Sequence, residues 1–136
     1  MALSVNLLQT QADCDLVLNE LNESKETLDF NRLRFERSKD TATERATSLE
    51  ADIAAALAEQ SSLATIIASL PEGATKAEMQ IRKTHTDYRL FQLELRKSAS
   101  GTTAVILFES QIGETDGRLA VINASIAEVE ARKAVI

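Results

Sequence analysis

The sequence is poor in the residues that break helices and in those that fill large cores. Among 136 residues there are one proline, four glycines, four phenylalanines, one tyrosine and no tryptophan. A β-sandwich or an α/β enzyme ordinarily has more glycine and proline in its turns and more aromatic side chains in its core. This balance indicates long helices with thin cores, and the hydrophobic fraction of 44% is too high for a disordered chain.

Residues that carry chemistry are scarce as well. One cysteine and one histidine exclude an intrachain disulfide and any metal site built on two histidines. The sequence contains no phosphate-binding glycine loop, nucleophile elbow or calcium loop. We therefore predict a protein that is not an enzyme, with no catalytic residue, no metal or cofactor site and no small-molecule substrate.

Charge and hydropathy exclude two further classes of partner. The chain has 15 basic and 21 acidic residues, a net charge of −6, whereas proteins that bind duplex nucleic acid concentrate lysine and arginine. No uncharged apolar run approaches the ~18 residues that span a bilayer. No basic residue precedes Lys25, so the N-terminus lacks the basic region of a secretory signal. We expect a soluble, intracellular part of a cellular or viral assembly, with no nucleic-acid partner and no membrane insertion.

The single proline lies almost at the middle of the chain and marks a reversal. Pro71 has no N–H to donate and ends a helix, and Gly73 accepts a positive φ that a tight turn needs. Thr75 and Glu78 have the spacing of a capping box, in which each side chain bonds the other residue's N–H. We predict a central turn at 70–74, with the chain folding back at Pro71–Glu72.

Both sides of this turn have the pattern of a coiled coil. Between residues 4 and 69 there is no proline or glycine, and a heptad seam repeats throughout. Its members are Leu7, Cys14, Leu21, Leu28, Phe35, Ala42, Leu49, Ala56, Leu63 and Leu70. The pattern predicts an all-α fold, a long antiparallel helical hairpin forming one domain over 1–136. The first arm spans about 4–69 and the second about 75–135.

The second arm continues this register and then shifts. Two stripes are expected to face the first arm: Ala77, Thr84 and Phe91, with Ile81, Tyr88 and Leu95 beside them. Beyond them the companion stripe slips by one residue, which marks a stutter or a break between two helices. The slip lies beside 98–103, a segment rich in serine and threonine, and the hairpin places this segment opposite the similar 38–43. Either the arms continue through these segments, or they bend there and form a four-helix bundle.

The end of the hairpin that holds both termini is its most apolar part, and its stripes are wider than a two-helix seam buries. We predict an interface there, formed by Leu3, Leu7, Leu8, Leu18, Phe108, Ile112, Leu119, Ile122 and Ile126. The leading hypothesis is a structural or assembly protein that self-associates, or docks to a larger assembly, through this base. The alternative is a helical adaptor or chaperone-like module that clamps a partner protein between its arms.

Overall fold

The computed structural model describes residues 2–136, with the backbone alone at Ser100, and its class is all-α as predicted. A short 3-10 helix, η1 (Val5–Leu7), precedes three α-helices, α1 (Gln11–Ser69), α2 (Ala74–Ser100) and α3 (Thr102–Ala134), and the described residues form no strand. Contacts divide the chain into two compact units. Unit 1 joins the residues up to Ser38 to Phe108–Ile136, and unit 2 is Lys39–Leu107. Met1, the first residue of the predicted single domain, lies outside the described residues.

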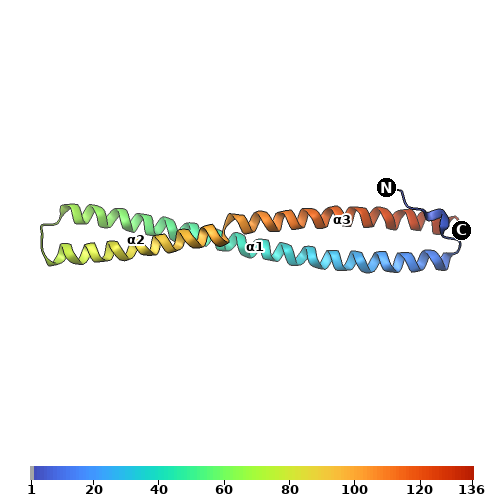
Figure 1. Cartoon of the computed structure of the whole chain (residues 1–136), viewed down its shortest axis with the longest axis horizontal. Coiled ribbons are helices and arrows are strands. Elements are labelled where there is room, and N and C mark those ends of the chain that lie inside the picture. Colours follow the sequence, from blue (N-terminus) through green and yellow to red (C-terminus); the bar gives the residue numbers. More distant parts are fainter. Residues whose placement is uncertain (1) are drawn as a thin grey trace. The chain divides into compact units, whose positions relative to one another are not determined.

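Unit 2 is an antiparallel helix pair closed by the predicted turn. Figure 1 shows α2 alongside the C-terminal part of α1. The connection comprises residues 70–73, one residue fewer than predicted. Gly73 has a φ of +154°, a conformation that side chains with a Cβ rarely adopt, and its carbonyl accepts the N–H of Ala77 at 3.1 Å.

The capping box predicted at Thr75 and Glu78 is wrong. Gly73 is the N-cap of α2 and no side chain caps the helix. Because α2 already begins at Ala74, Thr75 lies inside the first turn, where its hydroxyl is no longer at the capping position. The position of the glycine therefore decides where the helix starts.

The core of unit 2 shows that the predicted face of α2 is also wrong. Its buried members are Leu49 and Ala56 from α1 and Leu90 and Leu93 from α2, with Ile53 packed against them. The inward stripe of α2 consists of Met79, Lys83, Thr86, Leu90 and Leu93, all buried or half-buried. By contrast, all six residues predicted to face α1 (Ala77, Ile81, Thr84, Tyr88, Phe91 and Leu95) are exposed.

Hydrogen bonds and an ion pair explain how this inward stripe of α2, which includes polar side chains, can pack against α1. The Thr86 hydroxyl donates to the carbonyl of Arg82 at 3.0 Å, so its burial leaves no unpaired group. Lys83 pairs with Asp87 at 3.1 Å, and the same carboxylate accepts the side-chain amide of Gln60 from α1 at 2.7 Å. Of these bonds, the one from Gln60 to Asp87 joins the two helices and holds this face of α2 against α1.

Unit 1 pairs the N-terminal part of α1 with α3, again antiparallel (Figure 1). Cys14 of α1 and Val129 of α3 are fully buried and Leu28 of α1 nearly so. The heptad of the first arm predicts the burial of Cys14 and Leu28. Cys14 is thus a small buried core residue. Ion pairs join the helices, with Arg32 Nε 2.5 Å from Asp116 Oδ1 and Lys133 Nζ 2.6 Å from Asp15 Oδ1.

The first arm begins later than predicted, because α1 starts at Gln11 and not near residue 4. Thr10 Oγ1 accepts the N–H of Asp13 at 3.1 Å, and Asp13 Oδ2 accepts the N–H of Thr10 at 3.2 Å. This reciprocal cap fixes the start of the helix. The preceding segment bonds to α3: Arg132 donates twice to the carbonyl of Leu8, and Glu128 accepts the N–H of Leu3.

The two serine- and threonine-rich segments behave differently. The interruption expected at 98–103 is present, because α2 ends at Ser100 and α3 begins at Thr102. Gly101 between them is buried, and a Cβ there would lie 2.5 Å from the carbonyl oxygen of Lys97. At 38–43, by contrast, α1 continues without interruption, and the Thr43 hydroxyl donates to the carbonyl of Lys39 within the helix.

Candidate interaction surfaces

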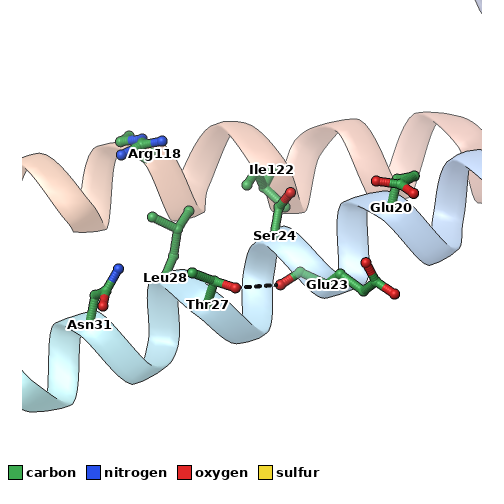
Figure 2. A pocket seen from close by; sticks show the side chains of 8 residues that line it. All are labelled: Glu20, Glu23, Ser24, Thr27, Leu28, Asn31, Arg118 and Ile122. Carbon is green, nitrogen blue, oxygen red and sulfur yellow. Dashed lines mark hydrogen bonds between the residues drawn. The ribbon is translucent and has the colours of Figure 1, made fainter.

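The α1–α3 pair of unit 1 has an open hollow of about 380 Å³ along one side. Figure 2 shows the eight residues that line it, of which Arg118 and Ile122 belong to α3 and the other six to α1. Those six are Glu20, Glu23, Ser24, Thr27, Leu28 and Asn31. The Thr27 hydroxyl donates to the carbonyl of Glu23 at 3.1 Å, so it is engaged within its own helix.

Polar side chains predominate in the lining of this hollow. It contains hydroxyls and carboxylates but no histidine, and the one histidine of the chain, His85, lies in unit 2. The hollow opens to solvent along the helix pair, so it cannot exclude water from a reaction. Among the described residues no group of three or more histidine, cysteine or acidic side chains is placed to hold a metal ion.

The surroundings of His85 are cationic. A second hollow, of about 240 Å³ in unit 2, is lined by Arg82, His85, Thr86 and Arg89 of α2 and by Glu59 of α1. The Thr86 hydroxyl already donates to a backbone carbonyl, so it is not paired with His85 as a nucleophile would be with its base. The arrangement presents positive charge at the surface.

Three charged groups have pKa values that their partners shift. The side-chain amide of Gln60, and then Lys83, lower the pKa of Asp87. The pKa of Arg32 is raised by hydrogen bonds to Asp116 and then Glu36, and that of Lys133 by its hydrogen bond to Asp15. Each of these groups takes part in a bond within or between helices, so the shifts reflect how the helices hold together.

The predicted interface residues at the base are mostly engaged inside unit 1. Seven of them are half-buried: Leu8, Leu18, Phe108, Ile112, Leu119, Ile122 and Ile126. Leu3 and Leu7 remain 40% and 71% exposed. The uncovered apolar surface at this end is therefore narrower than the sequence suggests, although Leu16 and Val121, 67% and 66% exposed, add to the apolar surface of unit 1.

A longer apolar surface lies on α2, where sequence reasoning had placed the seam. Ile81, Tyr88, Phe91 and Leu95 are 55–63% exposed, and Ala77 and Thr84 continue the same heptad pattern. We call these six residues the outer stripe. The sequence did contain a signal for it, since α2 carries two stripes of 3.5-residue period on different faces, and one neighbouring helix covers only one of them.

Comparisons with known proteins give no further identification. No protein-family model, no curated protein and no solved structure matches this chain. Within the described residues, none of the helices combines the length and the apolar character needed to cross a bilayer.

Proposed function

We propose that this protein is a non-enzymatic structural or assembly protein that associates with further copies of itself, as a soluble component inside the cell. The observation that supports this most directly is the outer stripe of α2. Four large apolar side chains there are more than half exposed and recur at coiled-coil spacing, and regular apolar rows of this kind mark helix-binding surfaces. The thin two-helix cores agree with this role, because such pairs gain stability by packing against other helices.

The second candidate is an adaptor that binds a different protein. Cationic side chains on the side of α2 nearer α1 favour it, since Arg82, His85 and Arg89 line a hollow there with Glu59 of α1. An amphipathic partner helix with acidic flanks would complement such a surface. In this case the chain alone would stay monomeric and its melting temperature would rise when the partner is added.

Light scattering coupled to size-exclusion chromatography, over a concentration series from about 1 µM to about 1 mM, tests self-association. We expect the mass per particle to rise with concentration above that of one chain, 14.9 kDa. A single-chain mass throughout the series would refute self-association and favour the adaptor. Replacing Leu7, the most exposed residue of the predicted base, by glutamate tests whether that end takes part.

A further inference from the structure

The outer stripe matches itself when a second copy of α2 runs in the opposite direction. In an antiparallel pair of helices, each residue of one apolar row packs against a residue of the other row on the second helix. The stripe extends from residue 77 to residue 95, so its centre is position 86. About this centre two copies form three kinds of pair, each made twice: Ala77 with Leu95, Ile81 with Phe91, and Thr84 with Tyr88. Every residue of the stripe therefore has a partner.

The sizes of the side chains favour this direction. The two small side chains of the stripe, Ala77 and Thr84, belong to the same row, and the other row is large throughout. The antiparallel arrangement places Ala77 against Leu95 and Thr84 against Tyr88, so the layers of the contact are of similar volume. A parallel arrangement would place each residue against its own copy, with alanine on alanine and tyrosine on tyrosine. Such layers alternate between voids and crowding, which protein cores avoid.

The central pair has matching polar groups. The Thr84 hydroxyl donates to the carbonyl of Gln80 at 3.0 Å, which leaves its oxygen lone pairs available to accept a hydrogen bond. Tyr88 is 63% exposed, and its phenol needs an acceptor when the side chain becomes buried. In the antiparallel arrangement Tyr88 of each copy would lie beside Thr84 of the other, so a hydrogen bond between them satisfies both groups.

The acidic residues at the edges of the stripe are compatible with this arrangement. Like edges meet in an antiparallel pair, so Glu78 would lie opposite Gln92 of the second copy and Glu94 opposite its Gln80. All four side chains are exposed within one copy. A glutamine amide donates to a carboxylate, so each of these acids meets a donor and not another charge.

Two further residues would meet their own copies near the centre of the contact. Asp87 lies on one edge, but its carboxylate already accepts the amide of Gln60 and pairs with Lys83 within one copy, which offsets its charge. His85 lies on the other edge, and two imidazoles, each with a donor and an acceptor, can share a hydrogen bond. Neither edge therefore opposes the contact.

We propose that the outer stripe of one copy packs antiparallel against the outer stripe of a second copy, about a two-fold axis beside position 86. This inference rests on the proposed self-association and specifies its surface. Because both copies use the same surface, the contact is isologous and closes at two chains.

The area of the contact sets its strength. Ile81, Tyr88, Phe91 and Leu95 are 55–63% exposed. At roughly 100 Å² uncovered on each large side chain, the eight from two copies bury on the order of 800 Å², and the smaller and flanking residues bring the total near 1,000 Å². That is the lower limit for a specific protein interface, so we expect a dissociation constant of about 1–100 µM.

A charge swap across one pair tests this register in the full chain. Ile81→Lys and Phe91→Glu each place a charge against an apolar side chain of the second copy, and a dimer of one variant contains that mismatch twice. In a dimer with one copy of each variant, the new lysine at position 81 lies against the new glutamate at position 91, and the other pair is Ile81 with Phe91. Both residues are more than half exposed within one copy, so each variant should fold, as its circular dichroism would verify.

Ala77→Glu is the matched control for the register. In the antiparallel contact position 77 is level with position 95 of the other copy, 14 residues from position 81 and therefore about 20 Å away at 1.5 Å of rise per residue. This variant should not restore pairing of Ile81→Lys. In a parallel contact the same two positions would be one helical turn apart and would attract. Val121→Glu on α3, where Val121 is 66% exposed, is the control for a charge outside the contact.

Light scattering over the same concentration series gives the result. We expect the wild type and Val121→Glu to reach the mass of two chains and no more. Ile81→Lys and Phe91→Glu alone should each associate at least about a hundredfold more weakly. Their equimolar mixture should recover two-chain particles, with a dissociation constant within about tenfold of the wild type, because only the mixed dimer pairs the two new charges. A mixture of Ile81→Lys with Ala77→Glu should stay as weak as its members.

Other outcomes separate this inference from the proposed function. If the first mixture does not recover, or if Ile81→Lys recovers with Ala77→Glu and not with Phe91→Glu, the two stripes do not pair in this register. If the single variants associate like the wild type, or if particles grow beyond two chains, the contact lies on another surface. In each of these cases the inference is wrong and the proposed self-association survives. A wild type that remains a single chain throughout refutes the proposed function itself.

Discussion

Two adjacent residues of α2 give a sharp test of which face of this helix meets α1. Leu90 is 8% exposed in the core of unit 2, whereas Phe91 is 57% exposed on the outer stripe. We compare Leu90→Ala with Phe91→Ala. The heptad pattern alone predicts that the phenylalanine is the buried member, so the two assignments give opposite results.

The expected magnitudes follow from burial. Leu90→Ala removes three buried carbon atoms, and at about 0.8 kcal/mol for each the loss is about 2–3 kcal/mol of unfolding free energy, with little added for a cavity because a two-helix seam can collapse. That corresponds to a fall in melting temperature of roughly 6–12 °C. Phe91→Ala should change the stability of one copy by less than about 0.5 kcal/mol, since alanine is the better helix former at an exposed site.

Urea unfolding followed by circular dichroism, at a concentration where light scattering gives the mass of one chain, measures both values. At higher concentrations Phe91→Ala should become destabilising relative to the wild type, because it weakens association, while the cost of Leu90→Ala stays constant. A loss above 2 kcal/mol for Phe91→Ala at low concentration, with less than 1 kcal/mol for Leu90→Ala, would show that α2 presents the other face to α1.

Further predictions concern pH and glycine. Because Gln60, and then Lys83, lower the pKa of Asp87 in the folded state, this carboxylate contributes stability above its ordinary pKa of 3.8 and loses it as the pH falls through the lowered value. Asp87→Asn should therefore reduce the loss of stability between pH 5 and about pH 2, seen as a smaller change in the urea midpoint. Gly101→Ala should destabilise by about 1–3 kcal/mol, since its Cβ would meet a backbone carbonyl at 2.5 Å. Gly113→Ala, where the new Cβ meets nothing, should instead stabilise by about 0.5–1 kcal/mol in thermal melts, and equal effects at both glycines would contradict the geometry.

Sequence reasoning succeeded where only one apolar stripe was present. In the first arm a single seam repeats without competition, and its members from Cys14 to Leu63 are buried or half-buried. The turn was predictable for a similar reason, since Pro71 and Gly73 are helix-breaking residues in a chain that has few of them. The break at Gly101 was also indicated, by a one-residue shift in the pattern beside a weak helix former.

Failures arose where two patterns competed. Thr10 with Asp13 and Thr75 with Glu78 both have capping-box spacing, but only the first pair forms the box, because Gly73 starts α2 too early for the second. In α2 two apolar stripes share the helix, and periodicity alone does not say which of them faces α1. The inward face includes Thr86, whose suitability for burial depends on a hydrogen bond that exists only in the folded helix.

The candidate interaction surfaces were also predicted only in part from the sequence. Residues such as Ile112 and Ile126 were correctly identified as apolar and placed at the end with both termini, but α1 and α3 partly bury them against each other. The outer stripe was identified as a heptad and wrongly expected to pack against α1, whereas its residues are exposed. Composition and periodicity therefore predicted where apolar side chains lie along the helices. Whether those side chains are exposed depends on how the helices pack, which the sequence pattern did not determine.

The division of the chain into units has a consequence for its synthesis. Unit 2 is continuous in sequence, so its helices can pair on the ribosome as soon as residue 107 has emerged. Unit 1 joins the two ends of the chain, and the N-terminal part of α1 must wait for α3 before Cys14 and Leu28 are covered. Closing that pair from the unfolded chain spans more than a hundred residues, but a preformed unit 2 shortens the loop and lowers its entropic cost. Because of this order of synthesis, we expect the helices to pair first next to the central turn and last at the termini.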